Sequence, residues 1–277
     1  MKEKRRISLT LLSFLTTILL STSCEDQNLE PSITTNSTSL TTAITQESTL
    51  TNLIYQETME GLTPFSTAHD WDIGSWDYAL QFVKSPIYKG LKTARFEIRK
   101  DQPLVANGKR SEITIIKGPL EKLTKNSWYS FAVYFPSYGY EYDDEREIIN
   151  QWYQNGSPAT SLRTRRDRIL LESGNTKDSR KQFDLGAIVK NKWHTFVFHF
   201  VHSYGTDGLI EVWFNGTKKL TLKGGNMYDD VLPKWKIGLY KSAFKYELSA
   251  VTRRVIYFDN VKVGNDKSTY ETMKPAL

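Results

Sequence analysis

Short apolar runs separated by turn signals fill the chain from about residue 52 onward, and no long stretch has the period of a helix. Aromatic and β-branched residues dominate these runs, as half-buried pleated strands require. Turn dipeptides such as Asn155-Gly156 and Asn215-Gly216 stand between them. The pattern predicts strands at Trp128 to Phe135, Trp193 to Val201, Leu209 to Phe214, Trp235 to Tyr240 and Val255 to Val263. Many short strands at this spacing indicate an all-β fold, a sandwich or jelly roll.

The first 23 residues have the layout of a cleaved export signal. A cationic stretch, Lys2 to Arg6, precedes an apolar stretch, Leu9 to Leu20, that is too short to span a bilayer. Small residues then lead to Cys24, the only cysteine of the chain, so no disulfide can form within it. This end resembles the bacterial lipobox, which implies that Cys24 is lipidated. An ordinary signal peptide with a chance cysteine is the alternative.

Three segments follow from this organisation. We expect a lipoprotein signal peptide at residues 1–23, a tether at 24–51 and one domain at 52–277. The tether is rich in Ser and Thr and buries too little surface to pack, whereas the last segment is long enough for a single large domain. The expected protein is exported, attached to the outer membrane by its lipid alone and exposed at the cell surface, because Glu25 and Asp26 resemble a surface-export signal. We expect a monomer.

The charge of the chain sets only a weak constraint on its partner. The formal net charge is +6, and without residues 1–23 the chain keeps 33 basic and 30 acidic residues, or +3. This small excess fits a polyanionic ligand. We expect no nucleic-acid partner.

Alternation along four predicted strands places polar side chains on a shared face, because residues two apart point the same way. Ile113 and Ile115 belong to the core, so the residues next to them point outward. In the strands near 151, 163 and 236, the polar residues likewise alternate with apolar residues that belong to the core. If these strands lie side by side, one sheet face carries Arg110, Glu112, Gln151, Tyr153, Arg163, Arg165, Lys236 and Tyr240. Arginine forks match carboxylates, amides hold hydroxyls and phenols can transfer protons. Such a face suits a carboxylated sugar.

The same segments carry a family resemblance. Arg110-Ser111-Glu112, Gln151-Trp152-Tyr153 and Lys236-Ile237-Gly238-Leu239-Tyr240 occur in this order and resemble the signature strands of jelly-roll polysaccharide lyases, the group of glucuronan lyases, heparin lyase I and alginate lyases. The likeness covers nearly all of residues 52–277. It implies a concanavalin-like jelly roll with a concave substrate groove, in a lyase that acts on an acidic polysaccharide, either a polyuronate or a glycosaminoglycan.

What the resemblance implies chemically is β-elimination at a uronic acid. A base removes the C5 proton next to the carboxylate, and the 4-linked oxygen leaves with a proton, so the carboxylate's growing negative charge must be stabilised. By position, Arg110 and Gln151 would hold the carboxylate, with Glu112, Arg163, Arg165 and Lys236 as further substrate-binding residues. Tyr240 would be the general acid or base. A tyrosine acting as base needs nearby cations.

The identity of the base stays open. Related lyases place a histidine where Tyr153 stands, so the candidates are Tyr153 itself, Tyr240 acting in both proton transfers, or a histidine from another strand such as His202. His199 has the opposite parity, and His69 lies in an acidic aromatic loop that could border the groove.

Two rival functions and one ion complete the expectations. A surface glycan-binding lipoprotein would use the same groove without catalysis. A laminarinase-like glycoside hydrolase would use two carboxylates, and Glu141, Asp143 and Glu145 have that family's spacing, although their surroundings indicate a loop. The elimination requires no cofactor. A structural Ca²⁺ is expected by analogy with related sandwiches, with Asp259 and Glu57 as ligands.

Overall fold

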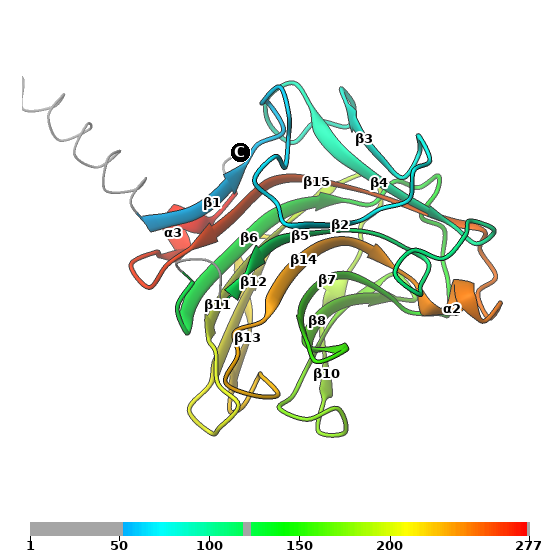
Figure 1. Cartoon of the computed structure of the whole chain (residues 1–277). Coiled ribbons are helices and arrows are strands. Elements are labelled where there is room, and N and C mark those ends of the chain that lie inside the picture. Colours follow the sequence, from blue (N-terminus) through cyan, green and yellow to red (C-terminus); the bar gives the residue numbers. More distant parts are fainter. Residues whose placement is uncertain (1–51, 119–122, 276–277) are drawn as a thin grey trace, which may run out of the picture.

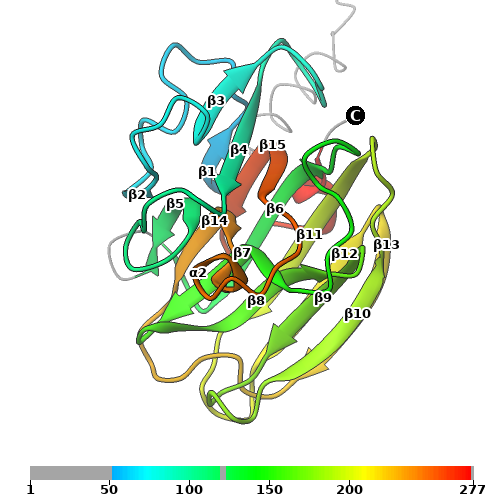
Figure 2. The same ribbon diagram turned by 90° about the vertical axis from the view of Figure 1, so that its right-hand side faces the viewer.

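The computed structural model describes residues 52–118 and 123–275, so the expected signal peptide, Cys24 and the tether before residue 52 lie outside the described residues. Within these ranges, antiparallel strands form two sheets that stack as a sandwich (Figures 1 and 2). The predicted all-β class is confirmed. No helix in the described part of the chain is both long and apolar enough to cross a membrane.

The elements in chain order are β1 (Leu53–Glu57), β2 (Asp70–Asp72), β3 (Leu80–Val83), β4 (Thr93–Arg99), β5 (Arg110–Lys117), β6 (Asn126–Tyr134), β7 (Glu147–Gln154), β8 (Ser157–Arg165), β9 (Arg168–Ser173), β10 (Lys181–Ala187), β11 (Trp193–Val201), β12 (Leu209–Phe214), β13 (Thr217–Lys223), β14 (Lys234–Tyr240), α2 (Ser242–Lys245), β15 (Arg253–Gly264) and α3 (Tyr270–Met273). All five strands that the apolar runs predict are present.

The strand order brings distant segments together. Among the described residues, sheet A has the order β13-β12-β11-β6-β15-β4-β3, with β1 also pairing with β15, and sheet B has the order β10-β9-β8-β7-β14-β5-β2. In sheet B the late strand β14 lies between β5 and β7, which are more than 80 residues earlier in the chain. This insertion is what assembles the polar face described below.

The core between the sheets is aromatic. Trp152 and Trp235 of sheet B are fully buried against Tyr129 of sheet A, with ring centroids 5.3 and 5.0 Å from that tyrosine. Phe200 lies 4.4 Å from Trp152. Large rings of this kind bury much apolar surface each, so they account for a large part of the stability of a sandwich that has no disulfide.

Tight turns close the hairpins at the positions where the sequence predicts them. Asn155-Gly156 joins β7 to β8 and Asn215-Gly216 joins β12 to β13, and all four residues have the positive φ of a type I′ turn. The turn between β8 and β9 uses Arg166 and Asp167, both also at positive φ. Two-residue turns fix the register of both strands, and register decides which side chains reach each face.

Candidate functional site

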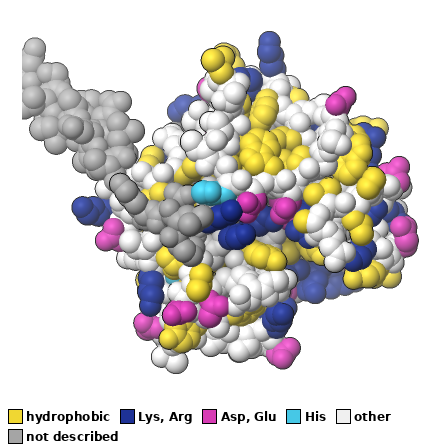
Figure 3. Space-filling view, in the orientation of Figure 1, with side chains coloured by type: hydrophobic (Ala, Val, Ile, Leu, Met, Phe, Trp, Pro, Cys, Tyr) yellow, Lys and Arg dark blue, Asp and Glu magenta, His cyan; other side chains and the backbone are white. Residues whose placement is uncertain are grey.

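The outer face of sheet B carries most of the polar residues that the sequence predicts to share a face. The strand register sets Tyr240 opposite Arg110, Gly238 opposite Glu112, and Lys236 opposite Gln151. We call the set Arg110, Glu112, Gln151, Arg163, Lys236 and Tyr240 the polar face. In Figure 3 basic and acidic side chains cross the middle of this side of the molecule, over β2, β5 and β14.

Glu112 is the centre of the polar face. It is 1% exposed, and its carboxylate accepts a hydrogen bond from the Gln151 amide. The same carboxylate forms ion pairs with two cations. Its Oε2 lies 3.2 Å from Arg110 Nη1 and 3.3 Å from Lys236 Nζ. The three donors satisfy this buried carboxylate, and the carboxylate in turn holds them in place. Glu112 therefore orients Arg110, Gln151 and Lys236 toward whatever occupies the face.

Tyr240 lies beside one guanidinium group and within electrostatic range of a second. The Arg110 guanidinium stands over its ring at 4.5 Å from the centroid, and Arg163 is close enough for the two side chains to interact electrostatically. Arg163 is held by Ser161 Oγ at 2.9 Å and by Glu172 Oε1 at 2.9 Å. Burial lowers the pKa of Arg163 to about 10, against the opposing effect of Glu172. Even so, the group remains cationic at neutral pH, and Tyr240 has positive charge beside it.

Tyr153 and Arg165 lie further from this centre. Tyr153 is half-buried, with Lys236 Nζ 5.8 Å from its ring centroid, and it lines a cavity of about 350 Å³ together with Lys117 and Lys234. That cavity extends the polar face at one end. Arg165 is exposed at the end of β8, where its Nε donates to the backbone carbonyl of Asp144 at 2.6 Å.

The histidines do not lie at the centre of the polar face. His202 is fully buried between the sheets, where its Nε2 is 2.9 Å from the hydroxyl of Tyr129, and burial lowers its pKa to about 3. A substrate on the outer face of sheet B cannot reach it, so the assignment of His202 as a base is wrong. His199 lies on the outer face of sheet A beside Glu211. His69 precedes β2, and its backbone N–H donates to the carbonyl oxygen of Thr114 in β5.

The short edge strand β2 adds two acids, which the sequence pattern assigns to a loop bordering the groove and not to a strand of the sheet. Asp72 lies opposite Glu112 and accepts from Lys236 Nζ at 2.5 Å, and Asp70 pairs with Lys117 at 2.8 Å. The one available signal was the alternation of Asp70, Trp71 and Asp72, which is too short to distinguish a strand from a loop. These acids offset part of the positive charge at the edge of the polar face.

The backbone conformation at position 238 requires a glycine. Its φ is +127°, and a Cβ there would lie 2.2 Å from the carbonyl oxygen of Ser111 on the neighbouring strand. The register between β14 and β7 shifts between Ile237 and Tyr240 at the same point. This irregularity turns the end of β14, and with it Tyr240.

The two expected calcium ligands have different surroundings. Glu57 uses both carboxylate oxygens to accept backbone N–H groups, from Met59 at 2.7 Å and Phe65 at 2.6 Å. Asp259 is fully buried, and burial, followed by smaller effects that include the nearby Glu60 carboxylate, raises its pKa to about 6. Carboxylate oxygens suit Ca²⁺ in kind. However, the described ranges contain no group of three or more His, Cys, Asp or Glu side chains that could hold a metal, and calcium stays a prediction.

The carboxylates with hydrolase-like spacing do not form a pair on a strand. Glu141, Asp143 and Glu145 lie in the connection between β6 and β7, not in a strand. Asp143 is buried and pairs with Lys241 at 3.0 Å, and Glu141 accepts the backbone N–H of Gly139 at 2.8 Å. These contacts are structural, which argues against the two-carboxylate chemistry of a retaining hydrolase.

Comparison with known proteins agrees with this geometry. No curated protein matches the sequence. Among solved structures, endo-β-1,4-glucuronan lyase from the fungus Trichoderma reesei superposes with a TM-score of 0.58 at 16% identity, covering 75% of this chain and 98% of that one. The catalytic domain of a glycoside hydrolase family 131 protein from Coprinopsis cinerea gives 0.57 at 12% identity, covering 80% and 97%. At such identities the likeness establishes the jelly-roll fold alone.

The family itself is established by sequence. A model of the family described as polysaccharide lyase matches residues 59–262, well over half of the chain and nearly all of the described sandwich. The matched range contains every residue of the polar face. Fold, site and family match therefore lead to one conclusion: this chain belongs to the polysaccharide lyase family.

Proposed function

We propose that the domain cleaves a 4-linked polyuronate by β-elimination on the polar face of sheet B, with Tyr240 as the catalytic acid and base. The observation that carries this proposal is the placement of Tyr240 beside the Arg110 guanidinium, 4.5 Å from its ring, in a face where Glu112 fixes the donors of Gln151 and Lys236. A phenol beside a guanidinium group, on a face that also carries further cations and an amide donor, supplies the groups that the reaction needs.

The reaction places a different demand on each group. The C5–H bond breaks and its proton goes to the base, the electron pair forms the C4–C5 double bond, and the C4–O bond breaks as that oxygen takes a proton. Negative charge grows on the C6 carboxylate in between, so fixed donors there lower the barrier most. Arg110, Gln151 and Lys236 would supply those donors, and pre-orientation by Glu112 means that they need not reorganise.

Tyr240 is proposed for both proton transfers. A phenolate oxygen that accepts the C5 proton can deliver it to the leaving oxygen when both lie on the same side of the sugar. Arg110 and Arg163 would stabilise the phenolate in the first step. Tyr153, beside Lys236, is the second candidate for the base because it lies on the same strand face as Gln151.

The substrate class follows from the charges at the site. The order we expect is a β-1,4-linked polyuronate first and a heparin-like chain second. The glucuronan lyase named above supports a glucuronan within the first class. The cations Lys117 and Lys234 beside Tyr153 would contact a neighbouring uronate of the chain.

The test uses the purified domain and a panel of polyglucuronate, alginate and a heparin-like glycosaminoglycan. Each elimination creates a conjugated C4–C5 double bond, which ultraviolet absorbance follows directly. Absorbance that rises with one uronate polymer supports the proposal and identifies its substrate. New reducing ends without absorbance on every polymer would refute it.

Replacement of Tyr240 by Phe removes only the hydroxyl group. General acid–base catalysis contributes roughly 10²- to 10⁴-fold in rate, so we expect kcat of Tyr240→Phe to fall by at least the lower figure while the circular dichroism spectrum is unchanged. Tyr138→Phe is the matched control, because Tyr138 is 77% exposed and contacts Arg253 away from the polar face. Equal rates for Tyr240→Phe and the unmodified domain would remove Tyr240 from the mechanism.

A further inference from the structure

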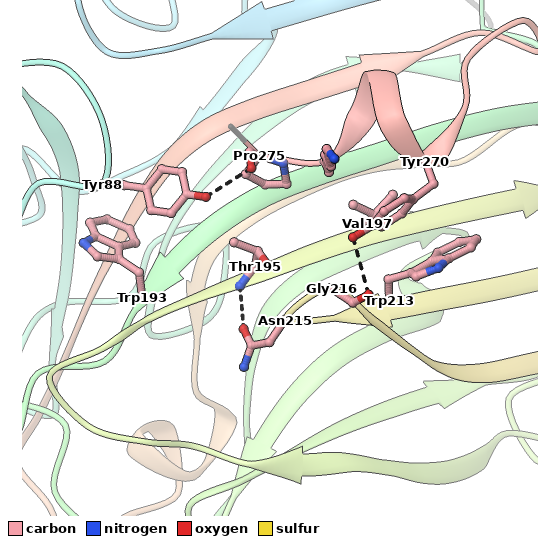
Figure 4. Close-up of a pocket in the computed structure, with 10 residues that line it drawn as sticks. Tyr88, Trp193, Thr195, Val197, Trp213, Asn215, Gly216, Tyr270 and Pro275 are labelled. Carbon is pink, nitrogen blue, oxygen red and sulfur yellow. Dashed lines mark hydrogen bonds between the residues drawn. The ribbon is translucent and has the colours of Figure 1, made fainter. Parts of the chain in front are cut away.

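A second cavity lies on the other side of the sandwich. It has a volume of about 680 Å³, larger than the cavity beside Tyr153, and Figure 4 shows its lining. Trp193, Thr195 and Val197 come from the outer side of β11, and Trp213 lies directly opposite Val197 on β12. The polar face is on sheet B and this cavity is on sheet A, so the two are separate sites. We call this cavity the aromatic groove.

Aromatic rings stand at both ends of the aromatic groove. Tyr88 and Trp193 form one end, with centroids 5.4 Å apart, and Trp213 and Tyr270 form the other, 5.3 Å apart (Figure 4). All four side chains are half-buried. Trp213 and Tyr270 pack in part against a small buried cluster of Trp128, Val197 and Met273, and the surface that the four rings leave exposed is large enough to bind a ligand.

The polar edges of three of these rings are already bonded to the protein. Trp193 Nε1 donates to the carbonyl of Ile87 at 2.9 Å, and the Tyr88 hydroxyl donates to that of Pro275 at 3.2 Å. The Tyr270 hydroxyl reaches the carbonyl of Gly216 at 3.5 Å. These three rings are therefore fixed in position and present mainly their apolar surfaces to a ligand. A preorganised surface of this kind costs little ordering entropy on binding.

The lining favours a sugar chain over an apolar protein segment. Between the rings lie the polar side chains of Thr195 and Asn215, and Val197 and Pro275 are the aliphatic members of the lining. Pyranose rings have an apolar C–H surface that packs on aromatic rings and hydroxyls that bond to polar side chains between them. A volume within about 300–1,000 Å³ is typical of ligand sites, and the aromatic groove is large enough for a short oligosaccharide.

Charge indicates which sugar chain fits. The lining includes the cation Lys274 and no acidic residue. A second cation, Lys218, stands over the Trp213 ring with its Nζ 4.6 Å from the centroid. Lys218 and Lys274 each also pair with a glutamate, so the groove is only mildly positive. Stacking would supply the affinity, and the cations would favour an acidic chain over a neutral one.

We infer that the aromatic groove is a second, non-catalytic binding site for a polyuronate chain, which holds the polymer on sheet A while the polar face of sheet B cleaves it. The inference rests on the proposed substrate class. Two sites on one domain raise the effective concentration of polymer at the catalytic face without any new contact there.

The experiment measures binding apart from cleavage. The chain of residues 25–277 with Tyr240→Phe is run in native gels that contain polyglucuronate, alginate or a neutral β-glucan, and retardation gives the apparent dissociation constant. Thr195→Glu places a negative charge in the groove without removing a ring, and we expect it to weaken polyuronate binding about tenfold. Thr195→Gln is the neutral match and should retain most of the affinity.

Two further variants protect the test against misfolding. Trp213→Ala should weaken binding to a similar extent, and Tyr138→Ala, an exposed tyrosine outside the groove, should not. Melting temperatures are compared for all variants, and if Trp213→Ala unfolds, Thr195→Glu decides the result.

Three outcomes would overturn the inference: retardation that Thr195→Glu leaves unchanged, retardation by the neutral glucan alone, or a dimer in size-exclusion chromatography that Thr195→Glu dissociates. Failure of the proposed function is recognised separately, because it appears as the absence of double-bond absorbance with the unmodified enzyme.

Discussion

At the scale of single residues, the position of Tyr240 depends on a glycine that has no chemistry of its own. Gly108 lies in the loop before β5, and a Cβ there would be 2.5 Å from Tyr240 Cε2 and 2.9 Å from Arg110 Nη2. No real Cβ makes contacts this short, so Gly108→Ala must displace one or both side chains. The catalytic geometry is sensitive to shifts of this size.

Gly108→Ala is therefore expected to lower kcat by about tenfold or more, with a melting temperature close to that of the unmodified protein. Steady-state kinetics by absorbance and differential scanning fluorimetry measure the two quantities. Gly61→Ala is the control, because a Cβ at Gly61 meets nothing within 4 Å. A normal kcat in Gly108→Ala would show that catalysis does not depend on the observed position of Tyr240.

Residue-scale reasoning from sequence located most of the polar face. Period-two alternation is a local rule, so Arg110 and Glu112, or Lys236 and Tyr240, share a face whatever the rest of the chain does. The same rule gives His202 the parity of Phe198 and Phe200, and the structure buries all three, although His202 is one of the candidate bases that the sequence leaves open. Alternation cannot tell which side chains contact each other across strands, so the central position of Glu112 was not predictable.

At the scale of elements, a buried ion cluster joins the end of β14 to other strands. Lys241 follows Tyr240 directly, is fully buried, and has its Nζ 2.6 Å from Glu147 Oε2 and 3.0 Å from Asp143 Oδ2. Arg254 of β15 lies 3.1 Å from Glu147 Oε1. Burial alone would raise the pKa of Glu147, but Arg254 and Lys241 more than offset this and hold it below the usual value.

Lys241→Met should destabilise the domain strongly, because Glu147 and Asp143 would lose a buried partner. Removal of one member of a buried ion pair costs about 3–5 kcal/mol. Urea unfolding at neutral pH measures this free energy. The exposed pair Arg168–Asp184 is the control, and Arg168→Met should change stability by no more than about 1 kcal/mol. Equal losses of unfolding free energy in the two variants would show that the buried cluster stabilises the domain no more than an exposed ion pair does.

The ionisation of Asp259 in β15 makes the stability of the domain fall as the pH rises. Its pKa in the folded protein, about 6, is above the ordinary value of 3.8, so the folded state binds this proton more tightly than the unfolded chain. The contribution of Asp259 to stability is then largest below about pH 4 and falls as the pH rises to about 6. In Asp259→Asn this contribution no longer changes with pH.

Melting temperatures of the unmodified domain and Asp259→Asn are compared from pH 4 to 8 in a chelator. We expect the melting temperature of Asp259→Asn to rise relative to that of the unmodified domain as the pH rises. Calcium should then raise the melting temperature of the unmodified domain at pH 8 and have little effect on the variant, since the ion would stabilise the ionised carboxylate. A calcium effect of the same size in both proteins would exclude Asp259 as a ligand.

Element-scale prediction from sequence succeeded for long apolar strands and failed for short or polar ones. The predicted ranges of β11 and β12 match the observed bounds because their apolar residues and turns are both clear. β2 has only three residues, too few to show an alternating pattern. Most side chains of β10 and β13 are exposed, so these strands have no apolar run that would identify them in the sequence. The insertion of β14 between β5 and β7 depends on contacts more than 80 residues apart in the chain, beyond any local rule.

At the scale of the whole molecule, the described sandwich begins where the expected tether ends. β1 starts at Leu53 and pairs with β15 in sheet A, not with a strand of sheet B. The described chain therefore enters the sandwich through sheet A, the sheet that does not carry the polar face.

The anchor itself can be tested cleanly because Cys24 is the only cysteine of the chain. Expressed in a bacterium that processes lipoproteins, the full chain should partition into the detergent phase of a Triton X-114 extract and show no free thiol. Cys24→Ser should partition into the aqueous phase and keep its lyase activity, since residue 24 lies outside the matched range 59–262. A lipid chain adds about 0.8 kcal/mol of membrane affinity for each buried CH₂, so the two proteins should separate clearly. A reactive thiol on the processed protein, recovered in the aqueous phase, would show that Cys24 is not lipidated and that the signal is an ordinary secretory one.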